Sequence, residues 1–258
     1  MPNDITISLT YYGQVDKLVH HCNMFAEMSD VLKSHVTVQF INDAYDDQGI
    51  FDDILEAYKS RFNLKGYVVK QDIGFNNHGC RNLAMLESKT HWNWLIDIDA
   101  FPTEHLVQSI VDAELRDDQL YVFRVHFDHT DNPDDYELFD PKKILKVIAH
   151  PNIWLITKPC FWSTGGYDME FAGMRHGDKE FFLALDHDKY EHFLFHPDLE
   201  EEFSLHIQMP NRTKSYLNQI TQHVGYLNKC VDFVEKRNDN KERKMKKRLL
   251  CFNWQRII

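Results

Sequence analysis

The sequence predicts an α/β fold built on a doubly wound, mixed but mostly parallel sheet. Over about the first two hundred of its 258 residues, short apolar or β-branched runs alternate with segments whose apolar residues recur at helical spacing. Polar or aromatic residues follow three of these runs: Thr10-Tyr11-Tyr12, Asn42-Asp43 and Asp97-Ile98-Asp99. Because ligands bind at the carboxyl ends of parallel strands, we expect these three segments to meet at one edge of the sheet.

The first half of the chain predicts a β-α-β unit that continues as alternating helices and strands. In order, we expect a strand at 5–9, a helix over 18–26, a strand at 36–41, a helix over 51–62, a strand at 67–69, a helix over 77–87 and a strand at 92–98. Thr103 follows Pro102 and is suited to cap a helix that carries Leu106, Val107 and Ile110.

Two further strands, 120–127 and 153–157, flank a polar stretch at 128–143 that is rich in Pro and Asp. That stretch predicts a long loop, and loops of this length in compact domains often have a function.

Composition and length indicate one domain with an appendage. With 43% hydrophobic residues the chain can bury an ordinary core, and we assign 1–212 to a catalytic domain and 213–258 to a helical, basic C-terminal extension. No run approaches the roughly 18 apolar residues that a transmembrane helix needs, and no signal sequence opens the chain. We therefore expect a soluble, cytoplasmic protein.

Neither the cysteines nor the short motifs indicate a disulfide framework or a nucleotide-hydrolysing fold. The five cysteines are scattered and include no Cys-x-x-Cys pair, which argues against disulfides and structural zinc. The chain has no P-loop, no Gly-x-Gly-x-x-Gly and no Gly-x-Ser-x-Gly. ATPase, dinucleotide-binding and serine-hydrolase functions are therefore not predicted.

The net charge of −11 is unevenly distributed. From Lys236 onward nine basic residues face two acidic ones, so the preceding body carries about −18 and makes a poor general nucleic-acid surface. The basic run 241–248 predicts either a solvated helix or a contact with an anionic acceptor, a membrane surface or a polynucleotide.

Apolar residues in the C-terminal extension also form a pattern. Between 217 and 234 they recur in steps of three and four, which predicts a helix packed on the body or, alternatively, a homodimer through residues 216–234. The apolar residues of 249–254 indicate that the end of the chain docks back onto the body.

The acidic pair of Asp97 and Asp99 is the strongest single indication of chemistry. Residues two apart on a strand face the same way, so both carboxylates could reach one hard cation and, through it, a diphosphate. The alternative interpretation is a solvated turn with no ligand.

These residues resemble the nucleotide-sugar-dependent glycosyltransferases of the GT-A fold over about 5–214. The resemblance implies that Thr10, Tyr11 and Tyr12 open the nucleotide pocket and that Asp43 binds the base or ribose of the donor. It also implies that Arg81, in the segment Asn76-Asn77-His78-Gly79-Cys80-Arg81-Asn82, lies near the donor. Asp97-Ile98-Asp99 then corresponds to the DxD element, whose last carboxylate is the principal metal ligand.

The second half resembles the β1,4-galactosyltransferase type in particular. Phe161-Trp162-Ser163-Thr164-Gly165-Gly166-Tyr167-Asp168 is similar to that family's Gly-Gly-Tyr-Asp stretch, and His176-Gly177-Asp178-Lys179-Glu180 to its acidic cluster at the head of a helix. The resemblance implies that Asp178 is the catalytic base and that His206 completes the metal site with Asp97 and Asp99. The same stretch supplies the expected substrate-binding set, which is Trp162, Gly165, Gly166, Tyr167 and Asp168.

The chain departs from the family in one place. The family has an acidic residue directly before the catalytic aspartate, whereas this chain has Gly177, and the acid reappears at Glu180. His196 and His223 compete with His206 for the third ligand position, and the cluster His126-Phe127-Asp128-His129 offers another grouping of metal ligands.

Elementary chemistry agrees with these roles. Carboxylates plus one imidazole suit Mn²⁺ or Mg²⁺, and such a cation stabilises the charge that develops on a departing diphosphate. In an inverting mechanism a carboxylate takes the proton of the acceptor hydroxyl, and Asp178 is our choice. Gly165 and Gly166 allow close backbone approach, or form only a tight turn, while Trp162 and Tyr167 offer flat faces for a sugar.

We therefore expect a metal-dependent, inverting glycosyltransferase that moves a hexose or pentose from a UDP-sugar to a hydroxyl of a saccharide or glycan. One alternative acceptor is a hydroxylated base in DNA, as in viral DNA-modifying enzymes. Another alternative is a degenerate member that binds nucleotide sugars without turnover, which Gly177 favours. A nucleotidyltransferase would use similar carboxylates but would not explain Gly-Gly-Tyr-Asp and the late histidine.

Overall fold

The computed structural model describes residues 2–73, 76–128, 149–169, 177–186, 188–195, 205–208, 250 and 252–258. Its helices are α1 (Val15–Glu27), α2 (Asp30–His35), α3 (Gln48–Tyr58), α4 (Asn77–Glu87), α5 (Glu104–Asp112), α7 (Lys158–Ser163) and α8 (Gly177–Ala184). Its strands are β1 (Ile5–Tyr11), β2 (Val36–Asn42), β3 (Asn63–Val69), β4 (Trp92–Ile96), β5 (Ala100–Pro102), β6 (Gln119–Asp128), β7 (Ala149–Thr157), β8 (Glu191–Leu194), β9 (Leu205–Gln208) and β10 (Trp254–Arg256).

One mixed sheet organises the described residues. Its strand order is β10-β3-β2-β1-β4-β7-β6-β9-β5, with β8 paired to β6. The strands β3, β2, β1 and β4 run parallel, and β7 joins β4 in the antiparallel sense. Because the chain leaves β1 in one direction to form β2 and β3 and then returns to its other side for β4, a switch point lies at the carboxyl end of β1.

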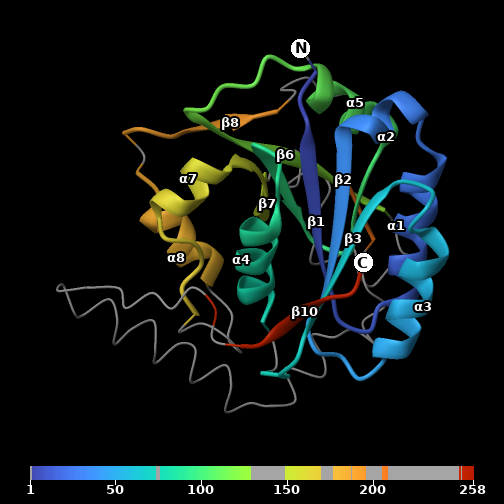
Figure 1. Cartoon of the computed structure of the whole chain (residues 1–258). Helices are drawn as coiled ribbons and strands as arrows, with labels where there is room; N and C mark the ends of the chain where they lie inside the picture. Colours follow the sequence, from blue (N-terminus) through green and yellow to red (C-terminus); the bar gives the residue numbers. More distant parts are fainter. Residues whose placement is uncertain are drawn as a thin grey trace, which may run out of the picture.

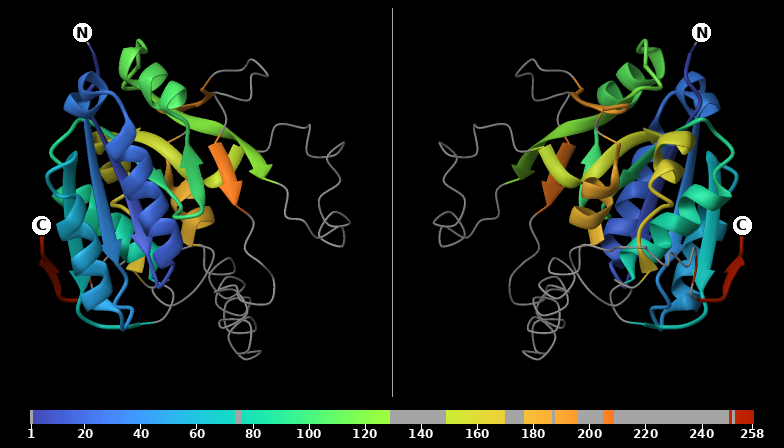
Figure 2. Two further views of the ribbon diagram at one scale, coloured as in Figure 1. Left: turned by 90° about the vertical axis from the view of Figure 1, so that its right-hand side faces the viewer. Right: turned by 90° about the vertical axis from the view of Figure 1, so that its left-hand side faces the viewer.

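Helices cover both faces of the sheet (Figures 1 and 2). On one face α1, α3 and α5 pack on the alternate side chains Ile5, Ile7 and Leu9 of β1. On the other face α4, α7 and α8 pack on residues of β2, β3, β4 and β7. The parallel strands are buried on both faces, which explains why they appear in the sequence as continuous apolar runs.

The predicted fold is confirmed, and most predicted elements lie where the patterns put them. Thr103 caps α5 as expected, because its hydroxyl accepts the N–H of Leu106 at 3.1 Å. The strand predicted at 92–98 is wrong at its end: β4 stops at Ile96, because Asp97 begins a turn in which its carbonyl accepts the N–H of Ala100. The short elements α2, β5, α7, β8, β9 and β10 were not predicted.

The end of the chain belongs to the sheet. β10 pairs antiparallel with β3, and the backbone of Ile257 donates to the carbonyl of Gly66. Phe252 is buried beside α4, so the predicted docking of the terminus is confirmed. The predicted stripe at 217–234, the homodimer through 216–234, the basic run, the 212/213 domain boundary and most of the predicted 128–143 loop lie outside the described residues.

Two further expectations concern the described residues only. Within them no helix is long and apolar enough to cross a bilayer. Cys22, Cys80 and Cys160 are free and buried, as expected for a chain without a disulfide framework.

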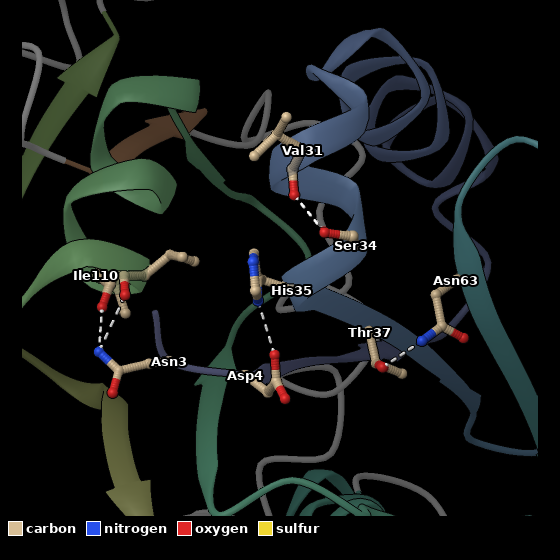
Figure 3. Close-up of polar contacts among 9 residues, drawn as sticks. Asn3, Asp4, Val31, Ser34, His35, Thr37, Asn63 and Ile110 are labelled. Atoms are coloured by element: carbon tan, nitrogen blue, oxygen red, sulfur yellow. Dashed lines mark hydrogen bonds and ion pairs between the residues drawn. The ribbon is translucent and has the colours of Figure 1, made fainter. Parts of the chain in front are cut away.

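Polar contacts fasten the amino-terminal end of the sheet, opposite the switch point (Figure 3). The side-chain Nδ2 of Asn3 lies 3.0 Å, 3.1 Å and 2.8 Å from the carbonyl oxygens of Ile110, Val111 and Ala113, respectively, at the end of α5. Asn3 therefore satisfies helix carbonyls that lack an intrahelical partner.

We predict that Asn3→Ala lowers the free energy of unfolding by about 1–2 kcal/mol, because the carbonyls of Ile110, Val111 and Ala113 lose the side-chain amide, although the last two keep a backbone N–H donor. Chemical denaturation measures the change. Ser34→Ala is the matched control, since the exposed hydroxyl of Ser34 contacts only the carbonyl of Val31, and should change stability by less than about 0.5 kcal/mol. Equal effects of the two substitutions would contradict the role given to Asn3.

Candidate active site

A buried guanidinium lies at the centre of the candidate site. Arg81 of α4 is 3% exposed, and its Nη2 donates to Asp97 Oδ1 at 2.6 Å. Its Nη1 donates to the hydroxyl of Tyr167 at 3.0 Å and lies 3.9 Å from Asp178 Oδ1. Burial alone lowers the pKa of Arg81, but Tyr167, Asp97 and Asp178 outweigh it and raise that pKa above its ordinary value. One fixed positive charge thus joins three predicted site residues.

The acidic pair lies in a turn instead of on a strand, so the argument from strand alternation was wrong. The turn runs from Asp97 to Ala100, and its middle is fastened from α1, where His21 Nε2 lies 3.0 Å from the carbonyl oxygen of Ile98. Burial lowers the pKa of His21 to about 3 despite that bond, so the imidazole is neutral and donates to the carbonyl. The ring also stacks on Phe101, with centroids 4.4 Å apart.

The backbone of β9 passes beside this turn. In the pairing of β5 with β9, His206 stands opposite Phe101, two positions after Asp99. The register thus brings the backbone of the predicted third ligand next to the acidic pair, although it lies more than a hundred residues later in the chain. The side chain of His206 is outside the described part of the structure.

The donor set at this turn fits a hard divalent cation. The carboxylates of Asp97 and Asp99 are the oxygen ligands that Mn²⁺ and Mg²⁺ prefer. Among the described side chains no three His, Cys, Asp or Glu residues form a metal-holding group. His206, the ligand that we predicted to complete the set, has its side chain outside the described residues.

Asp178, the predicted base, is in the first turn of α8 and close to α4. Its carboxylate is 17% exposed, and its Oδ2 lies 3.4 Å from Nε2 of the buried His78. Burial raises the pKa of Asp178, but His78 and Arg81 outweigh it and hold that pKa below its ordinary value. The start of a helix also favours a negative charge. Asp178 is therefore ionised at neutral pH.

The Gly-Gly turn is held by a single amide. Gly165 and Gly166 have φ of +79° and +78°, which favours glycine at both positions. Asn82 Nδ2 donates to the carbonyl of Tyr167 at 2.9 Å, and its Oδ1 accepts the N–H of Tyr167 at 2.8 Å. A Cβ at Gly166 would lie 2.6 Å from Asn82 Oδ1. The turn therefore sets the position of Tyr167 precisely against α4.

Tyr167 and Asp168 are too buried for the sugar contacts predicted for them. Tyr167 is 1% exposed, and its ring stacks on Phe181 with centroids 4.5 Å apart. Asp168 is 4% exposed. Phe181 of α8 covers the ring face of Tyr167 that we expected to contact a sugar. The hydroxyl of Tyr167 accepts a hydrogen bond from Arg81. Trp162, which is only half-buried, keeps part of its surface accessible.

At the end of β1 the three predicted donor-binding residues differ in exposure. Tyr11 is fully buried, and its hydroxyl donates to Asp47 while its ring packs on Phe51, so it has no free face for a base. Thr10 and Tyr12 are half-buried. Of the two tyrosines, Tyr12 is therefore the one whose ring can contact a ligand.

Asp43 connects the end of β2 to the start of α4. It is 1% exposed, and its Oδ2 accepts the N–H of Asn76 at 2.9 Å. Its Oδ1 has no hydrogen-bond partner among the described residues. Burial raises the pKa of Asp43 to about 7, against the opposing effects of Asn76 and the Cys80 thiol.

The two acidic positions lie on opposite sides of β1. Asp43 follows β2 and Asp97 follows β4, and both strands pair with β1. Two interstrand steps amount to about 10 Å, which is too far for one ion and comparable to the length of a nucleoside diphosphate. The edge of the sheet between these positions is therefore long enough for a nucleoside diphosphate, although Asp43 itself is as buried as Tyr167.

Solved structures with a similar fold include two glycosyltransferases. S. aureus TarS residues 1–349 match with a TM-score of 0.59 and 13% identity, over 84% of this chain and 64% of that one. The same TarS fragment in complex with UDP-GlcNAc matches with a TM-score of 0.58 and 11% identity, over 83% and 60%. The mannosyltransferase PcManGT from Pyrobaculum calidifontis, in complex with GDP-Man and Mn²⁺, matches with a TM-score of 0.60 and 13% identity, over 96% and 68%.

The chain has the GT-A fold. It spans less than two thirds of the TarS fragment, and at these identities the likeness concerns the fold alone. No family model and no curated protein sequence matches the chain.

Three residues of the site were missed in the sequence. His21 holds the turn after Asp97, His78 adjoins Asp178, and Asn82 holds the Gly-Gly turn. His78 and Asn82 both lie in α4, which is buried along most of its length. Several polar residues in a mostly buried helix could have indicated these contacts, because buried polar groups need hydrogen-bond partners.

We predict that Arg81→Lys lowers the free energy of unfolding by about 2–4 kcal/mol, because a single ammonium cannot span Asp97, Tyr167 and Asp178. Urea denaturation measures the effect. Arg116→Lys is the control, since Arg116 pairs with Asp118 on the surface, where both side chains are more than half exposed, and should cost less than about 1 kcal/mol. A small effect at Arg81 would contradict its central role.

We also predict a pH dependence set by Asp43. Because its folded pKa of about 7 exceeds its ordinary value of 3.8, the native state binds more protons than the unfolded state between these values. The contribution of Asp43 to the free energy of unfolding is therefore largest below about pH 4 and decreases as the pH rises to about 7. Asp43→Asn should remove this dependence and be more stable than the parent above pH 7, by on the order of 2–4 kcal/mol.

Urea denaturation from pH 4 to 8 measures both slopes. Asp53→Asn, at an exposed position of α3, should keep the parent's dependence. An unchanged slope in Asp43→Asn would show that Asp43 is not the titrating group.

Proposed function

We propose that this protein is a metal-dependent, inverting glycosyltransferase that uses a nucleotide-sugar donor. The observation that carries the proposal is the placement of Asp97 and Asp178 around the buried Arg81, at the carboxyl edge of a GT-A sheet. These carboxylates lie about eighty residues apart in the sequence. Asp97 suits the role of a metal ligand, and Asp178 suits the role of the base.

The donor would lie across the end of β1. The base and ribose would lie near Tyr12 and the end of β2, above the buried Asp43, and Asp97, Asp99 and His206 would hold Mn²⁺ or Mg²⁺. Such a cation stabilises the charge that develops on the diphosphate. Arg81 adds a fixed positive charge at the same place, and because it is already oriented by Tyr167 it needs little reorganisation during the reaction.

The acceptor would approach Asp178. Its ionised carboxylate accepts the proton of the attacking hydroxyl as the oxygen forms a bond to the anomeric carbon. The bond from that carbon to the diphosphate oxygen breaks, and its electron pair leaves with the diphosphate. Attack on the face opposite to the leaving group inverts the anomeric centre. Trp162 is placed to contact the apolar face of a sugar.

The finer parts of the proposal concern the substrates. The similar structures include a complex with UDP-GlcNAc and a complex with GDP-Man and Mn²⁺, which supports a nucleotide-sugar donor, and we retain a UDP-sugar. A saccharide or glycan acceptor, and the likeness of the second half to β1,4-galactosyltransferases, remain proposals based on the Gly-Gly-Tyr-Asp and Asp178 segments.

The alternatives receive no added support. The basic run that favoured a DNA acceptor lies outside the described residues. Gly177 favoured a non-catalytic protein, but it has another explanation, since a Cβ there would lie 2.7 Å from the ring of His78.

We predict opposite defects for two substitutions. With Mn²⁺ and a panel of UDP- and GDP-sugars, Asp99→Ala should abolish the metal-dependent part of donor binding measured by calorimetry. Asp178→Asn should bind the donor within about threefold of the parent, yet release nucleoside diphosphate at least about 100-fold more slowly, since it has lost the base.

Asp30→Asn is the control for both substitutions, because Asp30 is 98% exposed on α2, and it should match the parent. Turnover at the parental rate by Asp178→Asn would refute the assignment of the base. Failure of the parent to bind or turn over any of these sugars would refute the proposed function.

A further inference from the structure

A histidine and a glycine adjoin the proposed base. His78, in the first turn of α4, is 0% exposed, and its Nε2 lies 3.4 Å from Asp178 Oδ2. On its other side the ring packs against Tyr167, with centroids 5.2 Å apart. The imidazole therefore lies behind the carboxylate, on the side away from solvent.

Gly177 allows this approach. A Cβ at position 177 would lie 2.7 Å from Cε1 and 2.8 Å from both nitrogens of the His78 ring. Because an imidazole is rigid and this one is enclosed, a side chain at 177 would push the ring or the start of α8 away. The glycine directly before Asp178 and the histidine one hundred positions earlier thus form one arrangement.

We infer that His78 is a positioning residue for Asp178, and that Gly177 is required for its placement. The inference rests on the proposed function, in which Asp178 is the base. His78 holds Oδ2, while Oδ1 lies toward Arg81 at 3.9 Å. The two contacts fix the rotation of the carboxylate and favour its ionised form.

His78 does not replace Asp178 as the base. Its ring is fully buried, whereas the Asp178 carboxylate keeps 17% of its surface exposed, so only the carboxylate can reach an acceptor. The proton of the acceptor hydroxyl goes to Asp178. The Nε2 of His78 faces Oδ2 of that carboxylate and, when it carries a proton, donates toward that oxygen. Because the contact fixes the orientation in which the carboxylate meets the attacking hydroxyl, its loss affects turnover more than donor binding.

The experiment compares His78→Phe and His78→Gln in the full chain. Phenylalanine keeps a flat ring without a donor, and glutamine keeps a donor nitrogen at a similar distance from the backbone. Calorimetry with UDP- and GDP-sugars plus Mn²⁺ gives the dissociation constant. Release of nucleoside diphosphate with water as the acceptor gives kcat, and thermal unfolding shows whether each variant folds.

We expect His78→Phe to bind the donor within about threefold of the parent and to lower kcat by about 10- to 100-fold. His78→Gln should recover most of the loss. His91→Gln is the control, because His91 pairs with Asp117 on the surface, and should leave both values unchanged.

Gly177→Ala tests the inference without removing the imidazole, and provides the test if the substitutions at His78 do not fold. It should lower kcat with donor binding retained, whereas Gly49→Ala, where a Cβ meets nothing within 4 Å, should not. Parental kcat in His78→Phe or in Gly177→Ala would overturn the inference and leave the proposed function standing. An inactive parent would overturn both.

Discussion

The architecture of the candidate site depends on the burial of Arg81. A guanidinium that is 3% exposed is stable only if several partners neutralise and bond it. Those partners come from the turn after β4, the loop after α7 and the start of α8. Since each of these segments contributes a residue to the proposed chemistry, the requirement to satisfy one charge also assembles the site.

Helix α4 provides the rigid support for this arrangement. Its apolar residues, such as Leu83 and Met85, join the core on that face of the sheet. Its polar residues His78, Arg81 and Asn82 contact Asp178, the acidic turn and the Gly-Gly turn, respectively. Side chains on a packed helix are held more precisely than side chains on loops, so α4 fixes the positions of the three segments that it contacts.

Local patterns predicted the fold well, because the parallel strands and amphipathic helices have periodicities that can be recognised in one sequence. The same patterns failed at Asp97, where a turn replaces the expected strand, and at Tyr167, whose ring is buried under α8. Both failures depend on tertiary packing: His21 fastens the turn from α1, and Phe181 covers the tyrosine. The partners lie 77 and 14 positions away, and no local pattern contains them.

The pairing of β10 with β3 gives the last residues of the sequence a structural role. Without β10, β3 would be an edge strand that presents unpaired N–H and C=O groups. β10 covers Tyr67, Val68 and Val69 of that edge. The new edge is only three residues long and carries the exposed Arg256. Short, charged edges resist pairing with another chain, so β10 protects the sheet against edge-to-edge aggregation.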